Sequence, residues 1–382
     1  GASAAPAPAR SAANTAPAIH GHNVNPAAQA ALNAAPEDMA GVAYVTTSGD
    51  VAVPVATAAE RAAVTRAGLI PAAAPRGYRS VIALHDSVES QVARLGGTNT
   101  ILASTAQVAV TVPAAAARTT TAATLARTPG VSVRVVDAHA TPAVKITRVN
   151  AGTHARPAAS MIAGWTTALI NDGWVYLCTS GFNAHKGTQK VTLTAGHCTI
   201  TWPSFTLGRA VHAGSENGTV IGKTGSSWFK NGGYDQGLDY IYSTVSAPGR
   251  MAVRAGAAGS YRTVNRTISR PAQFTSLCKE GLATNHQCGI VTSMTANVTY
   301  EMEDPNRPGV ILARYRIYGL ATMSALTRSG DSGGPVVTNW SSTTVNAIGV
   351  TSGNTEWADG TFVEAYFAPL AKIAADYGAT LS

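Results

Sequence analysis

Hydrophobic and polar positions divide the chain into unlike parts. Residues 1–40 are dominated by Ala and Pro and offer little to bury, which predicts a flexible leader. Between residues 41 and 140, apolar positions recur at strand spacing and at helix spacing in turn. From about residue 161, short runs of Val, Thr, Ile and Tyr alternate with Gly, Asn and Ser, a pattern typical of an all-β barrel or sandwich.

The region 41–140 predicts a small α+β domain with two helices on one face of a sheet. The expected order is β-α-β-β-α-β, and glycine or proline stands at most of the boundaries. The predicted elements are a strand at 78–85, a helix at 86–97, one or two strands within 99–112, a helix within 113–130 and a strand at 131–138.

Two further segments complete the plan. Residues 141–161 have no clear periodicity and are expected to form a linker between the domains. Near the C-terminus, helical spacing returns once, which predicts a terminal helix with four apolar positions on one side: Leu370, Ile373, Ala374 and Tyr377.

Composition narrows the functional classes. A length of 382 residues with 45% hydrophobic residues suits two or three domains with a sizeable core. No apolar run is long enough for a membrane span. The net charge of +8 comes from scattered Lys and Arg with no interleaved aromatic residues, which argues against a nucleic-acid partner. We expect a monomer with neither a nucleic-acid nor a membrane partner.

The four cysteines form two local pairs. Cys178 and Cys198 are 20 residues apart, and Cys278 and Cys288 are 10 apart. No Cys-x-x-Cys is present, so zinc and redox sites are weakly supported and no metal is expected. Two short disulfide loops would suit an oxidising compartment. The opening small residues, GASAAPAPAR, are of the kind that follow a signal-peptidase cut, so a secreted protein is expected.

Three motifs in the second half carry chemistry. LTAGHC contains His197, YDQGLDYIYS contains Asp235 and GDSGGP contains Ser332. A serine hydroxyl becomes a nucleophile when a histidine takes its proton and a carboxylate orients that histidine. The chain order His, Asp, Ser matches chymotrypsin and differs from subtilisins and α/β-hydrolases. Glycines around Ser332 indicate backbone N–H groups aimed at a reacting atom, although a plain turn is the alternative.

Longer stretches carry a family resemblance. The segments ending in TAGHC and beginning LCKEGLATNHQCG, together with AIGVTSGNTEW and FAPLAKIAADYGATL, resemble the streptogrisin and α-lytic protease group of bacterial chymotrypsin-like serine peptidases. The resemblance covers residues 162–382. It implies an all-β catalytic domain, a chymotrypsin-like double six-stranded β-barrel with a C-terminal helix. It also implies disulfides within each of the two cysteine pairs.

The resemblance assigns roles around Ser332. The catalytic triad would be His197, Asp235 and Ser332, with the N–H groups of Gly330 and Ser332 as the oxyanion hole. Asp235-Gln-Gly-Leu fits the family pattern, but Asp239 four residues on remains the alternative triad acid.

The same group of peptidases stabilises the aspartate before the serine with a basic residue. In this chain the basic residue would be Lys279, which would pair with Asp331. The alternative is that Asp331 only caps the local turn. No cofactor is implied by the family.

Substrate preference is inferred from the same alignment of motifs. Leu326 stands where trypsin-like members carry an aspartate, and Thr327 follows it, so no carboxylate is available for Lys or Arg side chains. The backbone of Ser352, Gly353 and Asn354 would pair with an extended substrate. We therefore expect apolar or aromatic residues before the cleaved bond. Arg328 replaces a frequent cysteine, and attraction of acidic substrates by it is the alternative.

The first half has a predicted role as well. Bacterial members of this group are made with a pro-region that assists folding and then blocks the active site, so residues 41–140 are expected to be a pro-domain. A retained accessory domain is the alternative. Self-cleavage is expected within 157–164, just before Ile162.

The resulting hypothesis is a secreted serine endopeptidase in proenzyme form, acting on protein or peptide substrates with its own pro-domain as chaperone and inhibitor. An esterase or polyester hydrolase with the same triad, and a catalytically silent binding protein, are the rivals.

Overall fold

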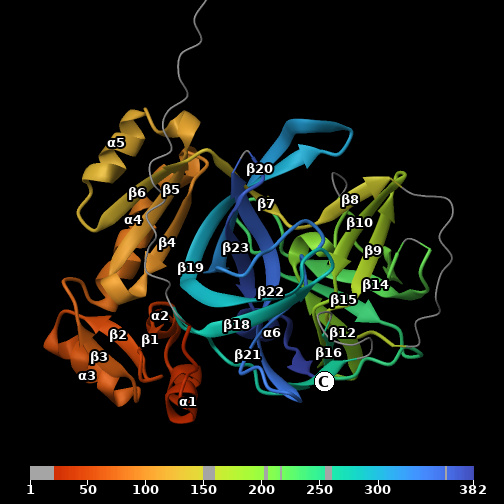
Figure 1. Cartoon of the computed structure of the whole chain (residues 1–382), viewed down its shortest axis with the longest axis horizontal. Helices are drawn as coiled ribbons and strands as arrows, with labels where there is room; N and C mark the ends of the chain where they lie inside the picture. The colour runs from red at the N-terminus through yellow and green to blue at the C-terminus, as the bar shows by residue number, and fades with distance from the viewer. Residues whose placement is uncertain (1–20, 149–159, 202–204, 216, 254–259, 358) are drawn as a thin grey trace, which may run out of the picture.

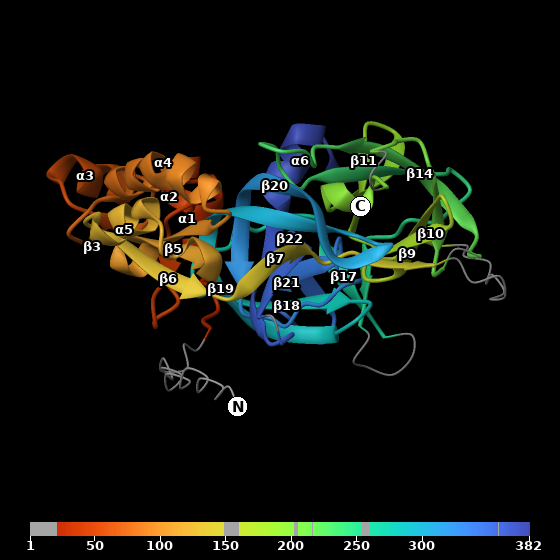
Figure 2. The same ribbon diagram turned by 90° about the horizontal axis from the view of Figure 1, so that it is seen from above.

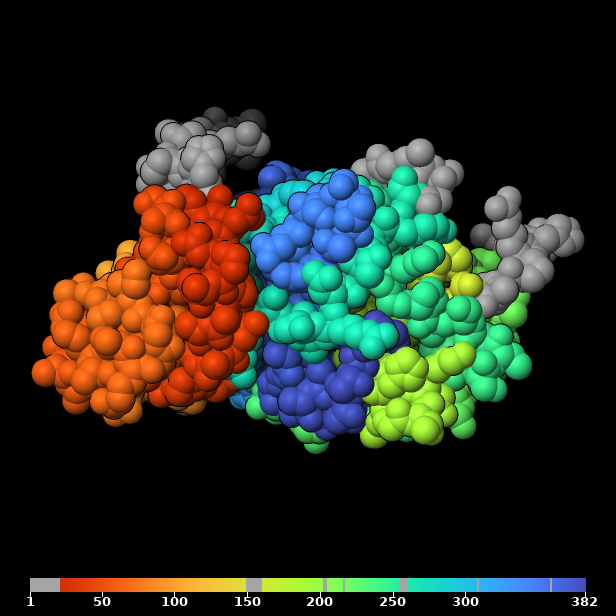
Figure 3. Space-filling model, turned by 90° about the horizontal axis from the view of Figure 1, so that it is seen from below, coloured from red at the N-terminus to blue at the C-terminus, as the bar shows by residue number. Residues whose placement is uncertain are grey.

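The computed structural model describes residues 21–148, 160–201, 205–215, 217–253, 260–357 and 359–382. Two halves lie side by side: a mixed helical and stranded N-terminal half, and a larger half built almost entirely of β-strands (Figure 1). In the space-filling view the N-terminal half forms a block against one side of the larger half (Figure 3). No helix in the described ranges is both long and apolar enough to cross a membrane.

The N-terminal half begins with a small unit around a three-stranded sheet. Its core gathers apolar residues from most of its elements, with Leu32, Val53 and Val64 fully buried, and Val81 from the next helix joins them. The elements are α1 (Pro26–Ala34), α2 (Glu37–Ala40), β1 (Tyr44–Val45), β2 (Val51–Val55), α3 (Ala58–Arg66) and β3 (Ile70–Ala73).

The predicted flexible leader is therefore wrong for residues 26–40. They form α1 and α2, which begin at or just after a proline, and they bury Leu32 and Met39. The earlier part of the predicted leader, residues 1–20, lies outside the described residues.

The second unit of this half has two helices on one face of a sheet, as predicted. Helix α4 (Tyr78–Arg94) and helix α5 (Thr120–Arg127) pack through Val88, Val92 and Leu125 against the sheet. The strands are β4 (Thr98–Leu102), β5 (Gln107–Pro113) and β6 (Val131–Val136), and short 3₁₀ turns occupy Ala103–Thr105 and Ala114–Ala116.

The strand predicted at residues 78–85 is wrong, because these residues form the first half of α4. Tyr78, Val81 and His85 are buried on the same face as Val88 and Val92, at helical spacing. The apolar residues of this segment fit a short strand equally well when taken alone. The continuous face over 17 residues is what favours the helix.

The N-terminal half is joined to the β-rich half through a shared sheet. Strand β4 pairs antiparallel with β19 (Asn285–Asp304), matching Thr100 with Ala296. Beside this junction the guanidinium of Arg316, on β20 (Arg307–Met323), lies 2.7 Å from a carboxylate oxygen of Glu89 on α4 and 2.6 Å from Oδ1 of Asn99. Burial alone would raise the pKa of Glu89, but Arg316 outweighs it and lowers that pKa.

The β-rich half has two β units, which lie next to each other in Figures 1 and 2. The first unit contains β9 (Thr166–Asn171), β10 (Trp174–Thr179), β11 (Phe182–Lys186), β12 (Gln189–Thr194), β13 (Ala210–Ala213), β14 (Val220–Ser227) and β15 (Gly237–Ile241). The second contains β16 (Arg250–Ala252), β17 (Tyr261–Asn265), β18 (Ser276–Gly281), β19, β20, β21 (Pro335–Thr338), β22 (Thr344–Trp357) and β23 (Phe362–Pro369).

The terminal helix is found where it was predicted. Helix α6 (Leu370–Tyr377) ends at Gly378, whose positive φ of 61° suits a glycine C-cap. Strand β24 (Thr380–Leu381) then pairs with β11 of the first unit. The helix joins the main core through four buried residues, the same four that the spacing indicated: Leu370, Ile373, Ala374 and Tyr377.

The predicted linker is wrong for residues 141–148, which contain the end of one strand and the whole of another in the β-rich half. Strand β7 (Ala138–Pro142) pairs antiparallel with β22, and β8 (Lys145–Arg148) pairs antiparallel with β10. Residues 149–159 lie outside the described residues. Beyond them Met161, Ile162 and Ala163 are buried.

Candidate active site

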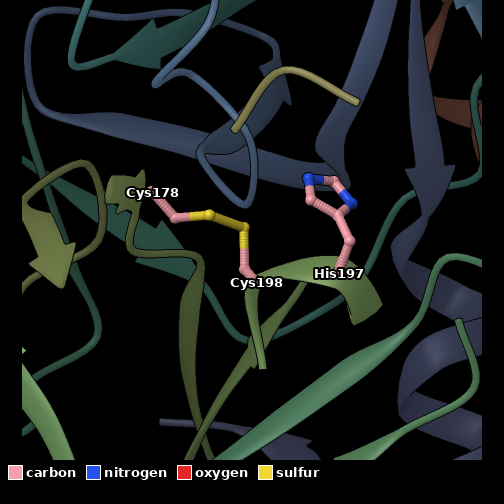
Figure 4. Close-up of side chains that lie close together, drawn as sticks. All are labelled: Cys178, His197 and Cys198. Carbon is pink, nitrogen blue, oxygen red and sulfur yellow. A yellow bond between two sulfur atoms is a disulfide. The ribbon is translucent and has the colours of Figure 1, made fainter. Parts of the chain in front are cut away.

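The site lies between the two β units and begins with His197. This residue sits in a 3₁₀ turn (Gly196–Cys198) directly after β12, where Cys198 is bonded to Cys178 on β10 (Figure 4). The imidazole is buried and packs edge-on against Phe229, with ring centroids 5.5 Å apart. The disulfide fixes the turn, and the turn fixes the imidazole.

Asp235 is the carboxylate that faces His197. It is fully buried, and its Oδ2 lies 2.8 Å from the imidazole Nδ1, while its Oδ1 accepts a hydrogen bond of 3.0 Å from the His197 backbone N–H. These contacts hold the ring so that Nε2 faces away from the acid. A carboxylate at Nδ1 also favours the tautomer with a free Nε2 lone pair.

Asp239, the alternative acid, lies elsewhere. It is on β15, opposite Thr192 of β12 and Thr224 of β14, and it is buried. Its Oδ1 has no hydrogen-bond partner among the described residues. Burial raises the pKa of Asp239 to about 8. The interpretation of the second acid as a surface carboxylate is therefore wrong, because Asp239 is only 4% exposed.

Ser332 completes the contact chain from the second β unit. Its Oγ lies 2.7 Å from His197 Nε2 and 2.8 Å from the backbone oxygen of Ser352. The serine is fully buried in the turn between β20 and β21. The structure thus brings His197, Asp235 and Ser332 together from three separate loops.

Two residues behind Asp235 extend this network. Ser352 Oγ donates a hydrogen bond of 2.5 Å to Asp235 Oδ2, and the hydroxyl of Tyr300 lies 2.7 Å from Ser352 Oγ. Burial, and then the Asp235 carboxylate, raise the pKa of Tyr300 well above its usual value. Because the Ser352 hydroxyl hydrogen goes to Asp235, the Tyr300 hydroxyl is the donor to Ser352 Oγ. The sequence motifs do not single out Tyr300, although it follows Val298 and Thr299 in β19, and they indicate Ser352 only as a substrate-binding residue.

The turn around Ser332 is held by a buried ion pair. Lys279 Nζ and Asp331 Oδ2 are 2.8 Å apart, and both side chains are fully buried. Thr284 Oγ1 and the backbone N–H groups of Ala283, Thr284 and Arg328 also donate to this carboxylate. Asp331 therefore does more than cap its own turn, because its partners come from two loops.

Charge and burial act in opposite directions on this pair. Burial would raise the pKa of Asp331, but the Lys279 charge and the hydrogen bonds outweigh it and lower that pKa. Burial lowers the pKa of Lys279, and Asp331 offsets part of that change. A buried pair with these satisfied bonds fixes the loop, whereas one partner alone would leave an uncompensated charge.

The N–H groups of Gly330 and Ser332 point at one oxygen. Both donate to the backbone oxygen of Ala143, at 2.5 and 3.2 Å respectively. Gly330 has φ of 110°, a conformation that favours glycine, so this residue type is required for the donor geometry. Two convergent N–H groups of this kind can stabilise negative charge that develops on a carbonyl oxygen.

The backbone expected to pair with substrate is paired with the chain itself. Gly353 and Asn354 on β22 lie opposite Pro142 and Thr141 on β7, and the N–H of Ala143 donates to the Ser352 oxygen at 3.1 Å. Strand β7 runs antiparallel to β22, as an extended peptide would in strand addition. Residues 138–143 therefore occupy the cleft.

The predicted pocket residues lie in the loop before Ser332. Thr327 is buried and its Oγ1 donates to the backbone oxygen of Ala325, whereas Leu326 is half-buried. The guanidinium of Arg328 contacts the Glu356 carboxylate and donates to the Gly360 oxygen. Arg328 is thus already neutralised by an acid of this chain.

Both predicted disulfides are present. They join Cys178 to Cys198 and Cys278 to Cys288. Each bonded pair lies beside a histidine, His197 or His286, in a grouping that resembles a metal site. Because these sulfurs are bonded to each other, they offer no thiolate ligands to a metal.

Comparison with known proteins gives the family. No protein-family model matches the chain. Serine protease 1 from Streptomyces fradiae is 30% identical over 318 residues, which cover 81% of this chain and 76% of that protein. The chain belongs to the bacterial streptogrisin-like serine peptidases.

Other similar proteins are of the same kind. Streptogrisin-A from Streptomyces griseus is 26% identical over 242 residues, covering 62% of this peptidase and 69% of the relative. Glutamyl endopeptidase 2 from the same organism is 27% identical over 208 residues, covering 53% of this peptidase and 92% of the relative. The two β units and α6 are the chymotrypsin-like double β-barrel and terminal helix of this family.

Solved structures also resemble this peptidase. Alpha-lytic protease homolog N4 has a TM-score of 0.43 and 25% identity, covering 58% of this chain and all of the other. Thermobifida fusca protease A has a TM-score of 0.42 and 24% identity, covering 58% of this chain and 98% of the other.

Proposed function

We propose that this serine endopeptidase is a secreted proenzyme in which Ser332 is the nucleophile, His197 the general base and Asp235 the residue that orients the base. One observation carries the assignment. The contacts from Asp235 through His197 to Ser332 Oγ end beside the oxygen to which the N–H groups of Gly330 and Ser332 both donate. Nucleophile, base and oxyanion donors are thus within reach of one carbonyl group.

The reaction follows from these positions. His197 Nε2 takes the Ser332 proton as Oγ attacks the carbonyl carbon, and Asp235 stabilises the imidazolium that forms. The N–H groups of Gly330 and Ser332 hold the oxyanion. The imidazolium then protonates the leaving amine, which gives an acyl-enzyme. Water, deprotonated by His197, hydrolyses the acyl-enzyme and restores Ser332.

The donors need no new amino terminus to take their positions. In the uncut chain Lys279 already pairs with Asp331, and the Gly330 N–H already points at a carbonyl oxygen. This supports an active site that is formed but covered before processing. Activation then consists of clearing the cleft.

The N-terminal half is proposed to be the pro-domain, now taken to begin near residue 21. The match to the Streptomyces fradiae protease extends over more residues than 162–382 contain, so it reaches into the N-terminal half. The β4–β19 pairing and the Arg316–Glu89 contact support an intramolecular chaperone, and β7 in the cleft supports an inhibitor. Secretion is supported by the two disulfides.

For specificity we propose apolar or aromatic residues before the cleaved bond. Leu326 brings no charge to the pocket loop, and Arg328 is engaged by Glu356 rather than free for an acidic substrate. Glutamyl endopeptidase 2 is a relative that, by its name, cleaves at glutamate. An assay that compares peptides with glutamate and with an apolar or aromatic residue before the cleaved bond therefore distinguishes the two specificities.

The decisive experiment labels the nucleophile. The mature enzyme, freed of its N-terminal half, should react with a fluorophosphonate at Ser332, located by peptide mass spectrometry, and should cleave short peptides after Phe, Tyr or Leu. Matched amide and ester substrates measure the esterase activity of the same site. Absence of both labelling and peptide cleavage would contradict the proposed function.

A further inference from the structure

We propose that the peptide bond between Ala143 and Val144 is the bond that this chain cuts in itself, within the same molecule. The inference rests on the proposed function and specifies its first substrate. It is carried by the way residues 138–148 pass through the cleft, with the Ala143 oxygen at the N–H groups of Gly330 and Ser332 and with Val144 against the disulfide beside His197.

The acyl side of this bond is held in a substrate geometry. The Ala143 oxygen accepts hydrogen bonds from both Gly330 and Ser332, and the Ala143 N–H donates to the Ser352 oxygen. Before it, β7 pairs with β22 from Ala138 to Pro142. The Ala143 side chain is fully buried, so its pocket is closed to solvent. These contacts leave Ala143 as the residue whose carbonyl the Ser332 hydroxyl reaches.

The amine side is held as firmly. Val144 packs against the Cys178–Cys198 disulfide and Ala195, which flank His197 in sequence. Strand β8 then continues along β10, with Lys145 opposite Leu177 and Arg148 opposite Trp174. A peptide fixed by strand pairing on both sides of a bond meets the requirement for positioning of the reacting atoms.

The bond expected from the sequence, before Ile162, lies far from this geometry. Met161 and Ala163 belong to the main hydrophobic core. The oxygens of Met161 and Ile162 accept hydrogen bonds of 2.7 Å from Asn183 Nδ2 and Ser180 Oγ. Cutting this bond first would require Met161, Ile162 and Ala163 to leave their buried positions, whereas Ala143–Val144 requires no such movement.

The chemistry balances with water as the sole co-reactant. Ser332 Oγ bonds to the Ala143 carbonyl carbon while its proton passes to His197. The carbon–nitrogen bond to Val144 then breaks, and His197 returns the proton to the Val144 nitrogen. Water hydrolyses the Ala143 ester, leaving a carboxylate on Ala143 and an amine on Val144.

The first product remains in place after the cut. Residues 21–143 keep the pairing of β7 with β22 and of β4 with β19, together with the Arg316–Glu89 ion pair. The new Ala143 carboxylate would then inhibit the enzyme as a product until these contacts are lost. Residues 144–161 stay attached ahead of Ile162, and their removal is a later step.

The test uses the purified full-length chain. Intact-mass measurements over time should give one fragment that ends at Ala143 and one that begins at Val144, before any fragment that begins at Ile162. The rate constant should not change when the protein is diluted tenfold, because the reaction is intramolecular. The Ser332→Ala chain should remain whole under the same conditions.

A pair of variants at the bond tests the register. Ala143→Arg places a long cation in a closed pocket and should slow the cut by about a hundredfold. Ala143→Ser keeps a small side chain and should stay within about tenfold of the parent rate. Equal melting temperatures of the two variants would show that folding does not account for the difference.

The outcomes separate this inference from the proposed function. A first fragment beginning at Ile162 or within 149–161, absent from the Ser332→Ala chain, overturns the Ala143–Val144 assignment and leaves the proposed function standing. A wild-type chain that stays whole, yet yields an active peptidase when trypsin removes its N-terminal half, also overturns the Ala143–Val144 assignment and leaves the proposed function standing. A chain that is never cut and never reacts with a fluorophosphonate overturns both.

Discussion

The two β units supply the active site in different ways. The first unit contributes side chains, His197 and Asp235, which are aligned by hydrogen bonds to each other beside a disulfide. The second contributes mainly backbone, the N–H groups of Gly330 and Ser332, and holds it with the buried Lys279–Asp331 pair. Side chains that transfer protons must change charge, and in the first unit hydrogen bonds align them. Donors that stabilise an oxyanion must keep a fixed position, and in the second unit a buried ion pair holds them.

The largest effect on turnover should come from Ser332, the reacting side chain that the second unit supplies. Ser332→Ala should lower peptide turnover by about a millionfold, because it removes the hydroxyl that forms the acyl-enzyme. The measurement is kcat on a peptide substrate with the processed enzyme, obtained by supplying the variant with a separately expressed N-terminal half. Residual activity above one hundredth of the parent value would show that the nucleophile is misassigned.

The support of the first unit is tested at Asp235. Asp235→Asn should lower kcat at neutral pH by about ten-thousandfold, because the amide favours the wrong histidine tautomer. Asp239→Asn is the matched control, as Asp239 lies on the same loop and strand without contacting His197, and its kcat should change only a few-fold. If the two results are reversed, Asp239 is the triad acid.

The backbone support of the second unit is tested at Lys279. Lys279→Met leaves the Asp331 carboxylate buried without its cation and should destabilise the fold by about 3–5 kcal/mol. It should also reduce kcat more than KM, because the oxyanion donors lie beside Asp331. Thermal unfolding and kinetics give both quantities, and Lys279→Arg, which keeps the charge, is the comparison. Unchanged stability in Lys279→Met would show that the Lys279–Asp331 ion pair does not stabilise this part of the second unit.

A smaller effect is expected where the two units meet. Tyr300→Phe removes the hydroxyl that reaches Ser352 Oγ and keeps the ring volume, so it should lower kcat by about tenfold with little change in KM. The acidic limb of the pH–rate profile should shift as well, because Ser352 donates to Asp235. A structural role alone would change the melting temperature and leave the pH profile where it was.

The smallest effect on catalysis is expected at Asp239, whose titration acts on the stability of the first unit. The folded-state pKa of Asp239 is about 8, above the value of about 4 for an unfolded aspartate, so the folded chain binds the extra proton between these values. The resulting stability is fully present below about pH 4 and is lost as the pH rises through about 8. Asp239→Asn should flatten the fall in melting temperature between pH 5 and 8. If the melting temperatures of the parent and Asp239→Asn fall in parallel, a group other than Asp239 is responsible for the pH dependence.

Local motifs predicted the chemistry better than they predicted the fold around it. Gly330, Ser332 and His197 stand in short segments whose residue types are demanded by geometry, so the sequence could indicate that they come together. Asp239 could not be separated from a surface acid, because its burial depends on β12 and β14 from elsewhere in the chain.

The N-terminal half was harder to predict because its elements depend on partners. The segment 78–85 is helical through continuity with residues farther along the chain, and α1 and α2 form against a core that collects residues from seven elements. Residues 138–148 have no strand pattern of their own. They are strands because β22 and β10 offer backbone partners.

The pairing of β7 and β8 has a consequence for the chain's behaviour in solution. Removing them uncovers two edge strands, β22 and β10, whose unpaired backbone groups are open to any extended polypeptide. A peptidase must expose such edges to bind substrates, yet the same edges invite association between copies of the protein. Residues 138–148 cover both edges during folding. The edges are therefore exposed only once the active site is formed and the enzyme can cleave a polypeptide that pairs with them.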